Sequence, residues 1–301
     1  MKKMIYSAKY FLKNFIYKDG WQEYLSVAAT FWGIYSSIWA VTKVISETTG
    51  VACFEVMFES KHLMIAFVIF LYVIVSHRLD KSYSVLVSNN DLKVGLQVKK
   101  IEKIEADSYV IPTNTYFRTS TESDYISLQS VQGAIQEKIF KGKISVLDQL
   151  IRNSLDSQGI EYSETTDILG EVRKYPLGAV AKVDYEKKHY YFVAITDVNA
   201  YGKPVNQTKN NIDVAITALE NNICTIGHYD RLCMPLLGTG KAAIGQVTKD
   251  DVFRRTIDLF VDSEKKISRE LIIAINPDDY FENRINISAC KKYIEYKSQF
   301  K

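Results

Sequence analysis

Apolar residues near the start of the chain gather into two long uncharged runs. The first, residues 24–42, has no charged residue over 19 positions, and the second spans residues 62–77 around the apolar segment 63–75. A helix needs about 20 apolar residues to cross the hydrocarbon core of a bilayer. Trp21, Tyr24, Trp32 and Trp39 lie along or beside the first run, and such aromatic residues are typical of membrane interfaces. We therefore predict a transmembrane helical hairpin over residues 21–80.

The charges around these runs predict an orientation. Residues 1–20 contain five lysines and one acid, with apolar residues at helical spacing, which indicates a basic amphipathic segment at a lipid interface or on a soluble domain. The loop between the runs carries Glu47, Glu55 and Glu59, while Arg78 and Lys81 follow the second run. Since positive residues favour the cytoplasmic side, we expect both termini in the cytoplasm.

From about residue 82 onward, short apolar strands alternate with amphipathic helices. The predicted strands are residues 83–87, 109–112, 179–185, 190–195, 232–236 and 271–275, and the predicted helices are residues 146–155, 212–219 and 250–261. Asn210 and Asn211 offer an N-cap for the second of these helices. This alternation predicts one three-layer α/β domain with a mixed sheet over residues 81–301.

Composition excludes several classes of function. The net charge of +3 is too small to indicate a nucleic-acid-binding protein. The four cysteines form no CxxC pair, which favours a reducing compartment, and neither they nor the four scattered histidines have the spacing of a metal site. We therefore expect no metal and no bound cofactor.

A glycine-rich loop follows the predicted strand 232–236. Gly238 and Gly240 can take positive φ, so the backbone N–H groups of residues 237–243 can line a nest for a phosphate. A tight turn without a ligand is the plain alternative. The Walker A pattern fails because Ala242 follows Lys241 where serine or threonine is required, and the dinucleotide fingerprint fails because no ribose-binding acid is well placed after the loop.

Three segments together resemble macro domains, the α/β modules that bind ADP-ribose. These are the strand 106–114, which runs from Asp107 to Asn114, the loop 130–135 around Gly133, and the Gly-Thr-Gly loop within 235–240. The resemblance implies ligand contacts from Asn114, Ser130, Val131, Gln132, Gly133, Leu237, Gly238, Thr239, Gly240, Lys241, Ala242 and Ala243.

The same resemblance implies roles for these residues. Residues 237–243 would hold the diphosphate, together with the N-terminus of a helix after Gly133, and Asn114 would contact the distal ribose. Lys241 would add positive charge, or would only be a solvated side chain. Tyr280 or Phe281, after the strand 271–275, would cover the adenine or ribose, although ordinary core packing explains these aromatic residues equally well.

Departures from the macro pattern change the expected ligand. Leu128, Gln129 and Ser130 stand where the family has a glycine triplet, Ile111 replaces an asparagine, and Lys100 falls near the position of the adenine-reading acid. We therefore expect an ADP-ribose derivative as ligand and name no catalytic residue. A membrane-tethered ADP-ribosylhydrolase is the alternative, and a macro fold serving only protein interactions is a third possibility.

The pairing of a membrane hairpin with a divergent macro domain resembles the membrane effectors of type II Thoeris anti-phage systems. The resemblance implies a sensor in the bacterial inner membrane, spanning it more than once, with a TIR-domain enzyme as functional partner. That enzyme would make the ADP-ribose-derived signal. Binding of the signal would then drive homo-oligomer assembly and damage to the lipid bilayer.

Overall fold

The computed structural model divides into two compact units, Met1–Asp80 and Lys81–Lys301. It describes residues 21–50, 53–76, 82–87, 91–120, 126–167, 170–199, 204–205, 208–226, 231–239, 247–263, 265, 267–282 and 284–299. The predicted amphipathic segment at residues 1–20 lies outside these ranges, as do Gly240, Lys241, Ala242 and Ala243.

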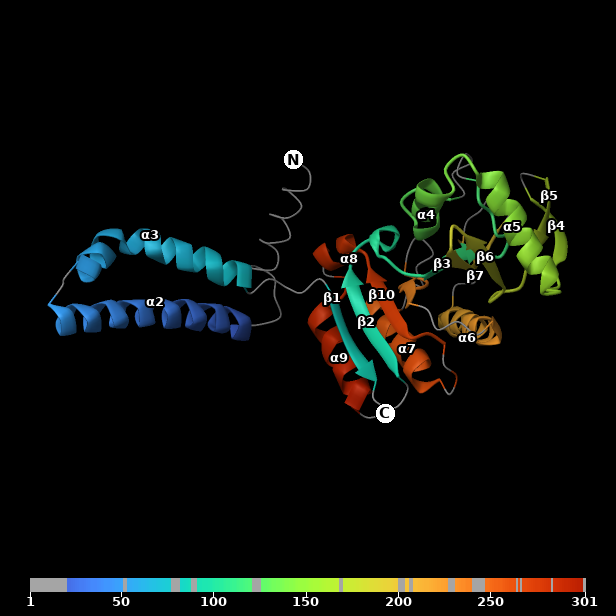
Figure 1. Cartoon of the computed structure of the whole chain (residues 1–301). Coiled ribbons are helices and arrows are strands. Elements are labelled where there is room, and N and C mark those ends of the chain that lie inside the picture. Colours follow the sequence, from blue (N-terminus) through green and yellow to red (C-terminus); the bar gives the residue numbers. More distant parts are fainter. Residues whose placement is uncertain are drawn as a thin grey trace. The chain divides into compact units, whose positions relative to one another are not determined.

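In the first unit, each of the two uncharged runs falls almost entirely within a helix (Figure 1). These helices are α2 (Trp21–Thr49) and α3 (Cys53–Ser76), and they pack against each other, with the rings of Phe31 and Phe70 in edge contact at 6.4 Å. Within the ranges that the structure describes, neither helix combines the length and apolarity of a membrane span. The predicted helices are therefore confirmed, and their predicted membrane crossing is not.

The second unit is built on one large sheet. Its strands lie in the order β1 (Ser82–Val87), β2 (Leu92–Val98), β10 (Glu270–Ile275), β9 (Arg231–Pro235), β3 (Ser108–Asn114), β7 (Lys188–Val198) and β6 (Val180–Tyr185). The short β8 (Pro204–Val205) pairs with β7, while β4 (Ser163–Asp167) and β5 (Gly170–Lys174) form a separate hairpin.

The sheet is mixed, as predicted. The five strands from β2 to β7 are parallel to their neighbours, and the outer strands β1 and β6 are antiparallel to theirs. The carboxyl ends of β10, β9 and β3, which are adjacent in the sheet, therefore meet at one edge. Ligands of open parallel sheets bind outside the carboxyl ends of the strands.

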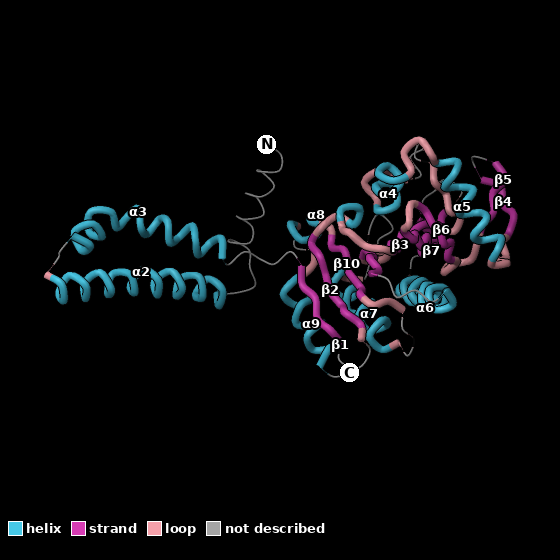
Figure 2. The backbone as a smooth tube through the Cα atoms, viewed as in Figure 1, coloured by secondary structure: helices cyan, strands magenta, loops and turns pink. Residues whose placement is uncertain are grey.

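Helices cover both faces of this sheet and complete the predicted three layers (Figures 1 and 2). They are α4 (Val131–Ile139), α5 (Ile144–Ser157), α6 (Lys209–Ile226), α7 (Lys249–Asp262), α8 (Pro277–Phe281) and α9 (Ile287–Gln299), with the short 3-10 helix η1 (Ile101–Lys103). Figure 1 shows α4 and α5 on one side of the sheet and α6 on the other. Helix α7 contacts both α6 and α9.

Alternation along the strands explains this layering. Tyr109 and Ile111 of β3 are buried in one cluster with Ile135 of α4 and Leu147 of α5, because every second side chain of a strand faces the same side. Burial of such apolar side chains is the main favourable term in folding.

One predicted helix boundary is wrong. Helix α6 begins at Lys209, so Asn210 and Asn211 lie within its first turn and are not its N-cap. The reason is a contact between side chains, because the Thr208 hydroxyl donates to Oδ1 of Asn211 at 2.6 Å and Asn211 N donates to the Thr208 carbonyl.

Candidate ligand-binding site

The predicted ligand-binding residues follow the carboxyl ends of three adjacent strands. Asn114 ends β3, residues 237–239 follow β9, and Tyr280 lies on α8 after β10. Residues 130–133 begin α4, which packs on β3. The topology thus gathers segments that are far apart in the sequence at one edge of the sheet. No bound molecule tests their roles, so the site stays a prediction.

Asn114 shapes the turn that leaves β3. Its side-chain Oδ1 accepts a hydrogen bond from Tyr116 N at 3.0 Å, and its backbone carbonyl accepts one from Phe117 N at 3.0 Å. Phe117 has a φ of 50°, in the left-handed region, which is uncommon for a residue other than glycine. The side-chain oxygen of Asn114 is therefore used within the chain, and its amide nitrogen is the group that can reach a ligand.

Two cations flank the ring of Tyr116 directly after Asn114. The Arg118 guanidinium lies 5.6 Å and the Lys174 ammonium 6.0 Å from the ring centroid. Lys174, at the end of β5, also pairs with Asp197 at 2.9 Å, and Asp197 accepts a hydrogen bond from the Thr115 hydroxyl. This part of the edge therefore places positive charge close to Asn114.

The loop before α4 is tightly closed. Ser130 is the N-cap, and its Oγ accepts from Gly133 N at 3.0 Å and donates to the Ser127 carbonyl at 2.6 Å. A Cβ at position 133 would lie 2.3 Å from the Ser127 carbonyl oxygen, closer than real contacts allow. Gly133 is therefore required because the backbone of Ser127 approaches it.

This geometry corrects the predicted start of the helix. Helix α4 begins at Val131, so Gly133 lies in its first turn and does not precede it. Because the Ser130 hydroxyl occupies Gly133 N, the N–H groups of Val131 and Gln132 are the donors at this helix end that lack a partner among the described residues. The Gln132 side chain is buried and donates to the Arg118 carbonyl at 2.7 Å, which ties α4 to the loop after β3.

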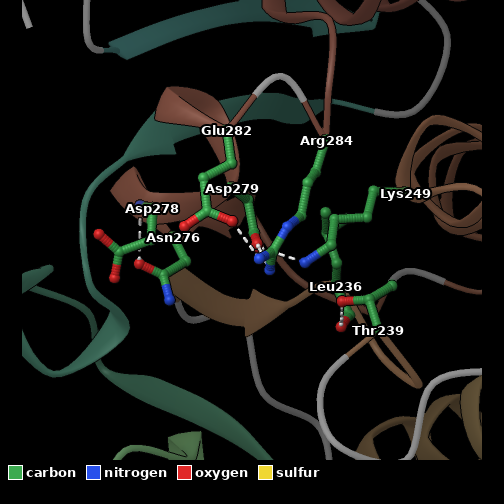
Figure 3. A network of polar contacts seen from close by, with 8 residues as sticks. All are labelled: Leu236, Thr239, Lys249, Asn276, Asp278, Asp279, Glu282 and Arg284. Atoms are coloured by element: carbon green, nitrogen blue, oxygen red, sulfur yellow. Dashed lines mark hydrogen bonds and ion pairs between the residues drawn. The ribbon is translucent and has the colours of Figure 1, made fainter.

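The start of the glycine loop has the predicted backbone conformation. Gly238 has a φ of 69°, in the left-handed region that glycine adopts without strain. Leu237 is buried below it, and the Thr239 hydroxyl donates to the Leu236 carbonyl at 2.9 Å (Figure 3). Residues 240–243 of the predicted nest lie outside the described ranges.

An ion-pair network joins the end of this loop to α8. Lys249, the first residue of α7, reaches Asp279 of α8 at 2.5 Å, and both side chains are mostly buried. Arg284 also reaches Asp279, at 3.4 Å, and pairs with Glu282 (Figure 3). Sequence reasoning missed this network because its members lie 30 residues apart, and the local signal is limited to the capping box of Thr248 and Asp251 that starts α7.

The network bears on the predicted aromatic cover. Asn276 caps α8 through its side chain, which accepts from Asp278 N, and Tyr280 follows on the same short helix, half-buried. The Lys249–Asp279 pair therefore connects the helix that carries Tyr280 to the helix that follows the glycine loop. The side chain of Phe281 is outside the described part of the chain.

Asp107, at the other end of the Asp-to-Asn signature, has a structural role. Its Oδ2 accepts from Arg231 N at 3.0 Å, and its own N–H donates to the Arg231 carbonyl. These bonds hold the first residue of β9 beside the start of β3, at the amino edge of the sheet. The signature thus combines one residue that aligns strands with another, Asn114, at the ligand edge.

Comparison with known proteins assigns the chain to a family. Residues 98–276 match the family model described as "Thoeris protein ThsA, Macro domain". No curated protein sequence matches significantly.

Solved structures with similar coordinates include three macrodomain proteins. The Oceanobacillus iheyensis macrodomain with ADP is 12% identical, with a TM-score of 0.49, covering 73% of this chain and 98% of that one. The macrodomain of Thermus aquaticus DarG is 11% identical, with a TM-score of 0.40 and coverages of 61% and 98%. Thermosipho africanus DarTG in complex with ADP-ribose is 11% identical, with a TM-score of 0.43 and coverages of 71% and 48%. On the family match over residues 98–276, the chain belongs to the Thoeris ThsA macro-domain family.

Proposed function

We propose that this protein is a membrane-anchored receptor for an ADP-ribose-derived signal. The observation that carries the proposal is the convergence of Asn114, the start of α4 and the Gly238 turn at the carboxyl ends of adjacent strands in a ThsA macro domain. The N–H groups of Val131 and Gln132 and the backbone at Gly238 would hold the diphosphate.

The site favours binding over turnover. The side-chain oxygen of Asn114 is engaged in its own turn, which leaves its amide to donate a hydrogen bond to the distal ribose or its substituent. Cys233 of β9 is fully buried, and this burial raises the pKa of its thiol, so β9 supplies no thiolate nucleophile. We propose that the bound derivative is not hydrolysed.

The first unit supplies the reason to propose membrane anchoring. Large apolar side chains stay exposed after α2 and α3 pack together, among them Trp32, Leu63 and Phe67, each more than half exposed. Exposed apolar surface of this extent marks an interaction site. The hydroxyls of Ser36 and Ser37 in α2 donate to the Gly33 carbonyl, so they need no water.

In this proposal the bilayer is the bacterial inner membrane, with both termini in the cytoplasm. A TIR-domain enzyme makes the signal, binding of the signal drives assembly of several copies, and assembly disrupts the membrane. Residues 240–243 complete the phosphate nest, and Tyr280 covers the ligand.

A titration of the detergent-solubilised full chain with ADP-ribose and its amino-acid conjugates tests this function. We expect a conjugate to bind with heat release and without product formation by chromatography. Substitution Gly238→Ala should lower the affinity at least tenfold because alanine resists a positive φ. Gly159→Ala is the matched control, since Gly159 has a φ of 64° but ends α5 far along the chain from the predicted site residues.

Three results would count against the receptor. Release of ADP-ribose from a conjugate would identify a hydrolase. Equal losses of affinity for the two glycine variants would remove the Gly238 loop from the site. Absence of binding to every ADP-ribose compound would favour a protein-interaction module.

A further inference from the structure

The two outer strands of the large sheet differ in how their free edges are treated. On β6, the Ser154 hydroxyl oxygen accepts from Lys182 N at 2.8 Å, and the Gln158 amide donates to the Val180 carbonyl at 3.0 Å. Helix α5 thus covers the edge of β6 with side-chain hydrogen bonds. On β1, no backbone group of the outer edge has a partner within the described residues. An open strand edge is a template for pairing with another chain.

The sequence of β1 lacks the features that usually block such pairing. Residues 82–87 read Ser-Tyr-Ser-Val-Leu-Val, with no charge and no proline. Natural edge strands are commonly protected by charged residues, proline or bulges. The open edge of β1 is therefore competent to add a strand.

A hollow of about 250 Å³ lies beside β1 on the face of the sheet that carries Ser82 and Ser84. By strand register, Ser84, Gly95 and Ile272 form one row across β1, β2 and β10. The hollow exists because Gly95 has no side chain, and a Cβ there would lie 2.5 Å from the Tyr83 carbonyl oxygen. The row thus offers an apolar floor, Ile272, next to two small residues.

An apolar side chain on the same strand matches this hollow. Leu86 shares the face of Ser82 and Ser84, because alternate residues of a strand face the same side. Its side chain is 57% exposed, although its neighbour Val87 is buried. One strand therefore carries both an exposed knob and a hole two residues away from it.

We propose that β1 pairs antiparallel with β1 of a second copy of this chain, about a twofold axis at Val85. Only registers that align residues of the same face keep the sheet continuous. In this register Val85 faces itself, and Ser84 faces Leu86 of the partner subunit. Each Leu86 then extends the Ser84–Gly95–Ile272 row of the other copy and fills its hollow, in the self-complementary arrangement of an isologous dimer.

This pairing deepens the assembly step of the proposed function and rests on it. Strand β1 begins at Ser82, directly after the first unit, which ends at Asp80. In the proposed register the two copies of Ser82 are offset by six residues along the strands, or about 20 Å at a rise of about 3.3 Å per residue. The dimer would therefore bring together the points at which the two first units join their sheets.

Disulfide cross-linking of the full chain in detergent tests the register. In a background with Cys53 and Cys224 replaced by serine, Val85→Cys should form a dimer on oxidation, with and without ADP-ribose compared. Residues facing each other on antiparallel strands have Cα atoms about 4.5–5.5 Å apart, within the range of a disulfide. Tyr83→Cys is the matched control, since its two copies would be offset by about 13 Å. No cross-link at Val85, or equal cross-linking at Tyr83, overturns the proposal.

A charge exchange separates pairing from damage to the fold. Ser84→Lys alone and Leu86→Glu alone should each lower the dimer fraction at least tenfold in light scattering. The double variant S84K/L86E should restore it, because the introduced ammonium would face the introduced carboxylate of the partner. Failure of the double variant to recover dimer counts against this register.

Titration of the same variants with the ADP-ribose compounds distinguishes the two proposals. Cross-linking at Val85 without any ligand binding would defeat the receptor function and leave the dimer standing. Ligand binding without cross-linking would defeat the dimer alone.

Discussion

Helices α3 and α7 both carry many apolar residues but place them differently. In α7, Val252, Phe253 and Ile257 are buried beside the sheet, and charged residues occupy the opposite face. In α3, Leu63 and Phe67 are exposed even though the helix packs against α2. A helix with one apolar stripe uses it up in a core, whereas a helix that is apolar all round needs an apolar surrounding.

This difference teaches how one chain divides its work. The second unit folds around its own core, which positions the strand ends and loops of the candidate site. The first unit keeps its apolar side chains on the outside, which is the property that a membrane-directed effector needs. Variants placed at equivalent residues in the two units can therefore separate folding, membrane association and ligand binding.

The largest expected effect is on the stability of the second unit. Phe253→Ala removes a fully buried ring from α7, and we expect the free energy of unfolding to fall by about 3–5 kcal/mol. Phe67→Ala removes a ring that is 60% exposed on α3, and the same free energy should change by less than about 0.5 kcal/mol. Urea unfolding in detergent, followed by circular dichroism, measures both.

A destabilisation of the second unit by Phe67→Ala as large as that of Phe253→Ala would break the comparison. It would mean that the exposed face of α3 is part of the core that stabilises the sheet.

The next effect concerns the membrane. Val68 is 58% exposed on α3, and a lysine at the centre of a lipid-embedded helix is unfavourable by about 2.5–3.5 kcal/mol. We expect Val68→Lys to lower the ratio of membrane-bound to free protein by roughly 100-fold, measured by flotation with lipid vesicles. Val146→Lys on α5 is the matched control, because Val146 is also exposed but belongs to the second unit. Equal flotation of both variants would remove α3 from the lipid contact.

A smaller effect is expected at the candidate site. Gly133→Ala places a methyl group against the Ser127 carbonyl, so the loop must shift, and we expect ADP-ribose affinity to fall about tenfold, or about 1.4 kcal/mol. Gly33→Ala in α2 meets nothing within 4 Å and should leave affinity unchanged. Calorimetric titration measures both, and vesicle flotation should be the same for both. Unaltered affinity in Gly133→Ala would show that the α4 loop does not hold the ligand.

The sequence predicts the central strands and helices of the second unit because their apolar periodicity is strong. It misses β2, where Lys93, Gly95 and Gln97 interrupt the apolar run. That interruption is a period-2 pattern, since Leu92, Val94 and Leu96 are buried, so the signal was present but masked by a glycine.

The candidate site is predictable only in part, for physical reasons. Strand ends and glycine turns are local, and Gly238 indeed takes a positive φ. The Ser130 cap was also legible as a helix start. The pair of Lys249 and Asp279 depends on how α7 and α8 are brought together, which no spacing in the chain expresses.

The smallest expected effect is a change in pH dependence within the second unit. Burial, and next the nearby Tyr109, raise the pKa of Tyr190 to about 12, above the value of about 10 in an unfolded chain. A raised pKa means that the folded state keeps a proton that the unfolded state loses, so this contribution to stability is complete below pH 10 and is lost between pH 10 and 12.

Tyr190→Phe removes this titration, and the fall of the unfolding midpoint between pH 10 and 12 should become shallower. It should not vanish, because the pKa values of Tyr83 and Tyr293 are also raised to about 12. Tyr72→Phe, at a position 63% exposed on α3, should leave the slope unchanged. If the two variants flatten the slope equally, titration of the first unit contributes to the stability of the second, and the two units do not unfold independently.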